Sequence, residues 1–384
     1  MTIRFTQAAL LLVVAACGAA PSTSAQQGSG ERPFSVTPVA NFTSPWAMDF
    51  LPGRGARQTS LALVSEKEGK LWLLDVATGK RQPVAGVPTA KVAGQGGLGD
   101  VVAHPGFAGN QRVYLTYVEA GANGTSGAVL GYGRLQLQGQ PRLTGFKAIW
   151  RQTPKVTGDG HFAHRIAFAP DGTLFLSSGD RQKMEPAQDM AQDLGKIIRL
   201  TAEGGVVPGG PWASRGGRQA TYWTMGHRNV LGLAFAPDGR LWASEMGPRH
   251  GDELNLIVRG RNYGWPRVSY GSHYEGRDIP DEHASRGFEE PKLWWTPAIS
   301  PGGLLIYSGQ LFPAWRGDAL IPALSGQALV RVDIDGDNAR KADEWAMGAR
   351  IREVAQGPRG EVYLLEDARG GKGGRLLRLE PVRR

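Results

Sequence analysis

One short pattern recurs along this chain and constrains its fold more than any other feature. In each copy an apolar segment leads into a turn around a proline, and a second apolar segment follows. The clearest copies are residues 166–176 and 233–242, where Pro-Asp-Gly forms the turn. Proline presets the turn, and the alternating apolar residues after it are typical of half-buried strands. The prolines at these turns are Pro52, Pro105, Pro170, Pro237, Pro313 and Pro358, and the copy at Pro313 is the weakest.

The spacing of these turns predicts the number of structural units. Successive prolines are 45 to 76 residues apart, which leaves room for about four strands in each unit. The 55 glycines and 25 prolines also disfavour helices, because both residues destabilise helix interiors. Pro-Asp-Gly turns occur in many β proteins, but the spacing of the six copies over the whole chain favours a propeller over a sandwich. We therefore expect an all-β fold, a six-bladed β-propeller that forms a single domain over residues 36–384.

The N-terminal segment is expected to precede this domain. Residues 1–25 contain an apolar run over 8–16 that is too short to span a bilayer but is typical of a secretory signal peptide. Cleavage after this segment leaves residues 26–35 as a flexible leader. An alternative is a lipobox-like site in which Cys17 becomes a lipidated N-terminus. Both alternatives predict export to the bacterial periplasm, and no later apolar run is long enough for a transmembrane span.

Composition and charge exclude several classes of protein. The 44 basic residues exceed the 35 acidic ones, for a net charge of +9, but the arginines are scattered. Nucleic-acid binding requires a basic patch or stripe, so we expect no nucleic-acid partner. A single cysteine excludes zinc fingers, iron–sulfur clusters and disulfide scaffolds. A positive field can still attract a small polyanionic ligand.

Polar residues that could carry chemistry occur first at His161, with Asp180 one strand later. A carboxylate beside a histidine orients the ring and stabilises its protonated form, so this pair is a candidate general base with its orienting partner. The alternative is a histidine that bonds a turn carbonyl.

Arginines form a second group of candidates. Arg228 and Asn229 stand in the segment Gly-His-Arg-Asn, and they offer donors suited to a carboxylate or a quinone oxygen. The alternative for Arg228 is a structural ion pair. Arg350 and Arg352 place two guanidiniums on one face of a strand, which indicates an anion at that face.

The segment 245–266 is the third and densest group of polar residues. Pro248 restricts the backbone of Gly247 to extended conformations, so a turn here can present successive carbonyl oxygens in one direction. Carbonyl and carboxylate oxygens are the ligands that calcium prefers. The spacing is not that of an EF-hand, and a purely structural calcium or no ion at all are the alternatives.

In combination, these stretches resemble the soluble quinoprotein sugar dehydrogenases, bacterial aldose dehydrogenases that use pyrroloquinoline quinone (PQQ). The most specific part is the ordered series Gly-His-Arg-Asn, Gly-Pro, Asp-Glu-Leu-Asn and Asn-Tyr-Gly-Trp-Pro, and the similarity extends from Ser44 to Arg352. The resemblance implies a six-bladed propeller with PQQ and Ca²⁺. It also implies oxidation of an aldose at the anomeric carbon to a lactone, with electrons passed to an external acceptor.

The resemblance also implies roles for individual residues. His161 matches the general base that takes a proton from the sugar while hydride passes to PQQ, and Asp180 matches the carboxylate that orients it. Gln95 matches a glutamine that lines the substrate and cofactor site. Arg228 and Asn229 match cofactor contacts beside the reactive carbonyls, so Arg228 is counted with His161 and Asp180 among the catalytic residues. The remaining matches are Arg350 and Arg352 on PQQ carboxylates, the carbonyls of Gly247 and Pro248 on the calcium that binds PQQ, and Glu253 with the Tyr263 carbonyl on a second, structural calcium.

The chain departs from the family pattern at two places. Ala163 and His164 follow the aromatic of the histidine motif where small residues are usual, which leaves His164 as an alternative base. Ser325 stands where some members have a lysine that contacts the cofactor. Two rival functions remain open: a calcium-dependent lactonase, which would not need Arg350 and Arg352, and an exported carbohydrate-binding propeller without catalysis.

Overall fold

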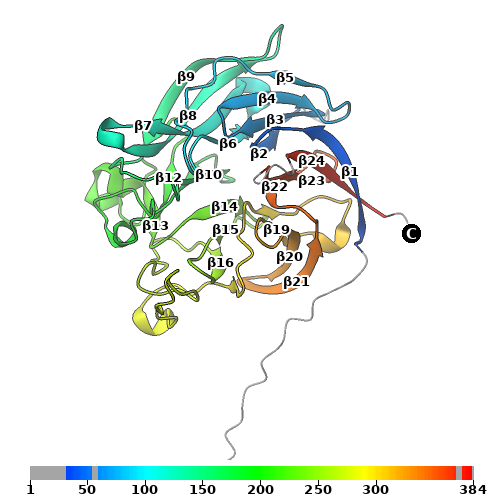
Figure 1. Cartoon of the computed structure of the whole chain (residues 1–384). Coiled ribbons are helices and arrows are strands. Elements are labelled where there is room, and N and C mark those ends of the chain that lie inside the picture. Colours follow the sequence, from blue (N-terminus) through cyan, green and yellow to red (C-terminus); the bar gives the residue numbers. More distant parts are fainter. Residues whose placement is uncertain (1–31, 54–58, 369–373, 383–384) are drawn as a thin grey trace, which may run out of the picture.

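Six four-stranded antiparallel sheets surround a central axis in the computed structural model, which describes residues 32–53, 59–368 and 374–382 (Figure 1). The predicted all-β, six-bladed propeller is confirmed. The predicted signal peptide with Cys17, and all but the end of the predicted leader, lie outside the described residues. No helix in the described ranges has the length and apolar character needed to cross a membrane.

Five of the sheets are built from consecutive strands. They are β2 (Pro45–Phe50), β3 (Leu61–Glu66), β4 (Lys70–Asp75) and β5 (Arg81–Pro83); β6 (Leu98–Ala103), β7 (Arg112–Ala120), β8 (Ser126–Gln136) and β9 (Arg142–Arg151); β10 (Ala163–Phe168), β11 (Leu174–Ser178), β12 (Lys196–Leu200) and β13 (Tyr222–Met225); β14 (Val230–Phe235), β15 (Leu241–Glu245), β16 (Asp252–Leu256) and β17 (Leu293–Trp295); and β18 (Leu305–Ile306), β19 (Ala319–Ala323), β20 (Ala328–Asp335) and β21 (Asn338–Ala346).

The sixth sheet joins the two ends of the chain. It consists of β22 (Ile351–Gln356), β23 (Val362–Glu366), β24 (Arg375–Pro381) and, as its outermost strand, β1 (Phe34–Asn41). Phe34 is opposite Pro381 in the pairing, and its ring packs edge-on against Trp345 with a centroid separation of 5.3 Å. The first strand therefore starts at Phe34 rather than at residue 36.

Helices are short and lie in the connections. They comprise α1 (Phe107–Asn110) and the 3₁₀ helices η1 (Ala122–Gly124), η2 (Glu185–Gln188), η3 (Ala213–Arg215), η4 (Gly217–Thr221), η5 (Ala284–Arg286) and η6 (Pro313–Trp315).

Every copy of the sequence repeat occupies the same position in its blade. Each of its prolines lies in the connection between the first and second strands of a blade, including the weak copy, where Pro313 lies between β18 and β19. The apolar segments on either side are these two strands, whose residues are mostly buried between neighbouring sheets. The repeat thus marks the position of every blade.

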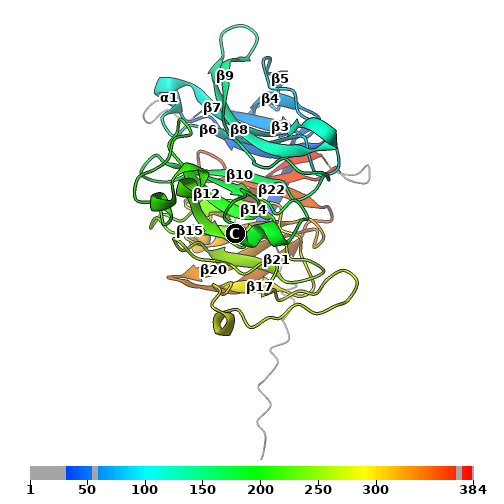
Figure 2. The same cartoon turned by 90° about the vertical axis from the view of Figure 1, so that its left-hand side faces the viewer.

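The first strand of each blade lies nearest the axis (Figure 1). Arg165 on β10 joins three of these strands, because its guanidinium binds Asp100 on β6 at 3.3 Å, Glu353 on β22 and the Leu231 carbonyl on β14 at 2.7 Å. The long insertion between β16 and β17, coloured yellow in the side view, extends beyond the body of the ring (Figure 2).

Candidate active site

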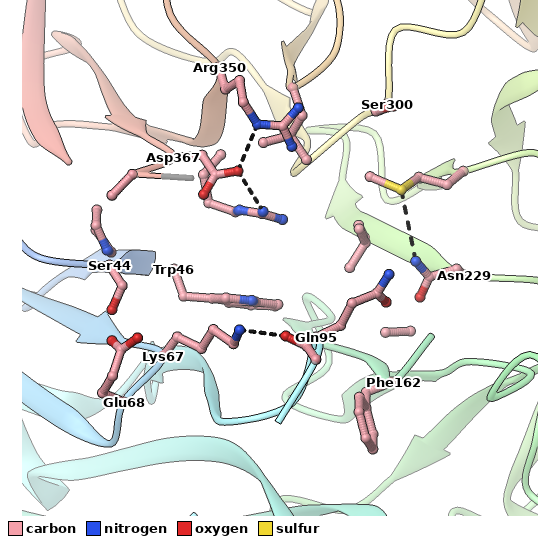
Figure 3. A pocket seen from close by; sticks show the side chains of 18 of the residues that line it. Ser44, Trp46, Lys67, Glu68, Gln95, Phe162, Asn229, Ser300, Arg350 and Asp367 are labelled. Carbon is pink, nitrogen blue, oxygen red and sulfur yellow. Dashed lines mark hydrogen bonds and ion pairs between the residues drawn. The ribbon is translucent and has the colours of Figure 1, made fainter. Parts of the chain in front are cut away.

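A cavity of about 710 Å³ lies where the innermost strands begin. Because these strands converge on the axis, the residues at or just before their first positions meet although they are far apart in sequence. Every blade contributes a lining residue of this kind: Trp46, Gln95, Phe162, Asn229, Ser300 and Arg350 (Figure 3). The ends of second strands add Lys67, Met246, Leu324 and Asp367 to the lining.

His161 and Asp180 form a hydrogen-bonded pair beside this cavity. His161 precedes β10 and Asp180 follows β11, and the His161 Nδ1 to Asp180 Oδ1 distance is 2.7 Å. The main-chain N–H of His161 donates to Oε1 of Gln95 at 2.7 Å, and Nε1 of Trp265 donates to Oδ2 of Asp180 at 2.8 Å. Asp180 is fully buried and His161 nearly so. Asp180 thus orients the ring, Trp265 holds Asp180, and Gln95 holds the main chain of His161.

The charge states of this pair suit a general base. Burial lowers the pKa of His161, although the Asp180 hydrogen bond opposes this shift. Burial disfavours ionisation of Asp180, but the hydrogen bond with His161 and the charge of Arg228 outweigh it and hold the pKa of Asp180 below its usual value. The ring is therefore neutral at neutral pH beside an ionised carboxylate. With Nδ1–H directed at Asp180, the lone pair lies on Nε2, for which no hydrogen-bond partner is found among the described residues.

His164 has a different environment. It is 2% exposed, its ring stacks on Trp46 with a centroid separation of 5.0 Å, and Nδ1 bonds Oγ1 of Thr116 at 2.8 Å. Burial, reinforced by the charge of Arg165, lowers the pKa of His164 to about 3. His164 therefore packs against Trp46, which lines the cavity, and supports it. The burial and stacking of His164 do not favour it as the general base.

Arg350 and Arg352 share one carboxylate at the cavity wall. Arg350 Nε and Arg352 Nη2 donate to Oδ2 of Asp367 at 3.0 and 3.1 Å (Figure 3). Burial lowers the pKa of Arg352, with Asp367 opposing the shift and two neighbouring arginines reinforcing it. Two cations on one oxygen leave excess positive charge, which suits an anionic ligand. Sequence analysis did not single out Asp367, which directly follows β23, the strand paired with β22.

Arg228 and Asn229 precede β14, and both are buried. Arg228 donates to the Met246 carbonyl at 3.1 Å and to the hydroxyl of Tyr274 at 3.2 Å, and in the described parts of the chain it forms no ion pair. Its Nε and the Oδ1 of Asn229 are buried without a partner among the described residues. Buried polar atoms of this kind are costly unless a ligand satisfies them.

Gly247, Pro248, Glu253 and Tyr263 line a smaller cavity next to Arg228. Its volume of about 10 Å³ leaves room for roughly one water-sized species. Burial, and then the charge of Glu245, raise the pKa of Glu253 to about 8. A Cβ at Gly247 would lie 2.2 Å from the His250 carbonyl oxygen, so this turn requires glycine. Over the described ranges no three His, Cys, Asp or Glu side chains converge on a metal position, so an ion here would use main-chain oxygens beside the carboxylate.

Two long insertions meet above the His161–Asp180 pair. Gln188, between β11 and β12, donates to the Trp265 carbonyl at 2.7 Å, and Trp265 in turn holds Asp180. Lys196 anchors the first insertion through the carbonyls of Pro186 at 3.0 Å and Leu194 at 2.7 Å. Sequence analysis assigned no role to Trp265, although it belongs to the noted segment Asn-Tyr-Gly-Trp-Pro.

Comparison with known proteins shows which family the chain belongs to. The family model of glucose / sorbosone dehydrogenases matches residues 42–378. The chain belongs to this family. The resemblance to the soluble sugar dehydrogenases is thereby confirmed, as is the prediction of an oxidoreductase.

Individual members match over nearly the whole chain. Aldose sugar dehydrogenase YliI of Escherichia coli K12 is 35% identical over 342 residues, which are 88% of this chain and 90% of the relative. A solved glucose dehydrogenase is 40% identical with a TM-score of 0.84, and covers 90% of this chain and 99% of its own. The PQQ-bound aldose sugar dehydrogenase of Streptomyces coelicolor is 29% identical with a TM-score of 0.73, over 90% and 98% of the two chains.

Proposed function

We propose that this sugar dehydrogenase uses PQQ and Ca²⁺ to oxidise aldoses at the anomeric carbon to lactones and passes the electrons to an external acceptor. The observation that carries the proposal is the juxtaposition of the His161–Asp180 pair with a cavity whose wall holds Arg350 and Arg352 on a shared carboxylate. The PQQ bound to the Streptomyces relative supports the same cofactor here. We also propose that residues 1–25 direct export of the protein, with or without a lipid on Cys17.

The residues present fit both groups. PQQ carries three carboxylates and an ortho-quinone, and Arg350 and Arg352 offer donors for a carboxylate, while Asn229 and Gln95 line the same cavity. The unpartnered Nε of Arg228 suits an oxygen that gains negative charge. For Ca²⁺, Gly247 and Pro248 would supply carbonyl oxygens, and Glu253 with the Tyr263 carbonyl would hold a second, structural ion. When bound, PQQ accepts the hydride from the sugar, and Ca²⁺ polarises the quinone.

The chain's own residues supply the proton chemistry. Asp180 keeps the Nδ1–H tautomer of His161 and stabilises the imidazolium that forms, and Trp265 holds Asp180 in place. Nε2 of His161 then takes the proton of the anomeric hydroxyl. Gln95 accepts the His161 N–H and so fixes the backbone that carries the ring.

Two rivals remain as outcomes of the test. A calcium-dependent lactonase would need an ion to polarise an ester, and would have no use for Arg350 and Arg352 on one shared carboxylate. A binding propeller without catalysis would have no use for a buried imidazole–carboxylate pair, since burying such charges is costly.

Reconstitution separates these possibilities. Apoprotein is mixed with PQQ and Ca²⁺, each alone and together, and dye reduction is followed with glucose and other aldoses. We expect reduction that requires both additions, and His161→Ala is expected to lose about 10²–10⁴ of the turnover with PQQ affinity retained. Lactone hydrolysis without PQQ would instead support the lactonase, and sugar binding without either reaction would support the binding propeller. Retained turnover in His161→Ala would show that the base has been misassigned.

A further inference from the structure

The cavity wall holds another cation besides Arg350 and Arg352. Lys67 follows β3 and lines the cavity, and Nζ donates to the carbonyl of Gly94. Among the described residues Lys67 forms no ion pair. Figure 3 shows Arg350 and Lys67 approaching the cavity from opposite sides of the view, with Trp46 between them.

The backbone that carries Lys67 is fixed on both sides. Its N–H donates to the Ser44 carbonyl at 3.0 Å, and its carbonyl accepts the N–H of Leu98 at 3.0 Å. Lys67 is thus held between the first two blades, and a half-buried side chain extends from a rigid base. One of its ammonium hydrogens serves Gly94, which leaves two for a ligand.

Arg350 and Arg352 can contact only some of the three carboxylates of PQQ, because Arg228 and the proposed Ca²⁺ are assigned to its quinone oxygens. Arg350 and Arg352 already share Asp367. Ser325 is a neutral residue, and its hydroxyl bonds the Ala298 carbonyl at 3.1 Å and the Ser300 hydroxyl at 2.8 Å. Lys67 is a lining cation without a carboxylate partner among the described residues.

We propose that Lys67 is a cofactor-binding residue that contacts a carboxylate of PQQ. The inference rests on the proposed function, because it takes PQQ as the ligand. Lys67 follows a strand of the first blade, whereas Arg350 and Arg352 belong to the sixth, so the cofactor would be contacted by cations from two different blades.

The test is the dissociation constant of PQQ for the Ca²⁺-loaded apoprotein, measured by quenching of tryptophan fluorescence at low and high salt. Lys67→Gln removes the charge but retains a donor for Gly94, and Lys67→Arg retains the charge. We expect Lys67→Gln to bind PQQ about 5- to 10-fold more weakly, with a shallower salt dependence, and Lys67→Arg to stay within about threefold of wild type. Lys91→Gln is the matched control, since Lys91 pairs with Asp159 and lies outside the cavity lining.

The outcomes distinguish this inference from the proposed function. If wild type binds PQQ and Lys67→Gln binds it equally well with unchanged salt dependence, the role of Lys67 is refuted while the proposed function stands. Equal loss in Lys67→Arg and Lys67→Gln also refutes it, because the side chain would then act through its shape and the Gly94 contact. If wild type does not bind PQQ, both proposals fall. Melting temperatures of the variants confirm that each one is folded.

Discussion

Replacing Asp180 by asparagine tests the general base without removing the histidine. The two carboxylate oxygens of Asp180 accept four hydrogen bonds. Oδ1 accepts from His161 at 2.7 Å and from the Gln182 N–H at 2.8 Å, and Oδ2 accepts from Trp265 at 2.8 Å and from the Met184 N–H at 3.3 Å. An amide has one acceptor oxygen, so one of these two sites receives an NH₂ group.

The geometry decides which site that is. Both donors at Oδ2 are fixed, whereas His161 can become an acceptor by moving its proton to Nε2. We therefore expect the Asp180→Asn amide to face His161 and to select the tautomer that has no lone pair on Nε2. Loss of a positioned base lowers turnover by about 10²–10⁴. The unsatisfied Gln182 N–H adds a stability cost of about 1–3 kcal/mol.

The assay is dye reduction by the reconstituted enzyme at saturating aldose, with the PQQ dissociation constant measured in parallel. Turnover should fall while PQQ affinity stays within about threefold of wild type. Asp189→Asn is the control, because Asp189 lies on the same insertion and bonds the Ala191 N–H and Gln192 instead. Turnover of Asp180→Asn within about fivefold of wild type would refute the role of this pair.

Three further predictions follow from the site and the sixth sheet. Because burial lowers the pKa of His161 and the neutral ring is the active form, kcat/KM should decline only as the pH falls through a midpoint below 6.5, as a pH–rate profile would show. A calcium chelator should weaken PQQ binding and lower the melting temperature, and added Ca²⁺ should restore both. Phe34→Ala, which empties a buried site against Trp345, should cost about 3 kcal/mol of unfolding free energy in a denaturant titration.

Much of the architecture could be predicted from local chemistry. The turn prolines locate every blade, because each one lies in the connection between a first and a second strand, where proline favours a turn. Even the weak copy at Pro313 lies at this position. The pairing of β1 with β24 could not be predicted in the same way, since no local signal connects residues at opposite ends of the chain.

The residues of the candidate site also differ in whether a local sequence signal could predict their contacts. His161 with Asp180, and Arg350 with Arg352, are pairs whose members are close in sequence or on adjacent strands, and the structure brings each pair together. Asp367 follows the second strand of its blade, as Asp180 does, so its contact with Arg350 could have been predicted from the same adjacency of strands. The packing of His164 beneath Trp46 depends on a bulge in β10, where the pairing register shifts between Ala163 and Ile166, and such irregularities leave no clear mark in sequence.

The shared sixth sheet also determines where a tether would attach. β1 is the outermost strand of its blade, so whatever precedes residue 32 joins the ring at its perimeter, whereas the cavity lies at the axis. A lipid or a fused domain placed before β1 would therefore leave the cavity mouth accessible. The same arrangement delays closure of the ring during synthesis, because the first strand of the chain pairs with the last one.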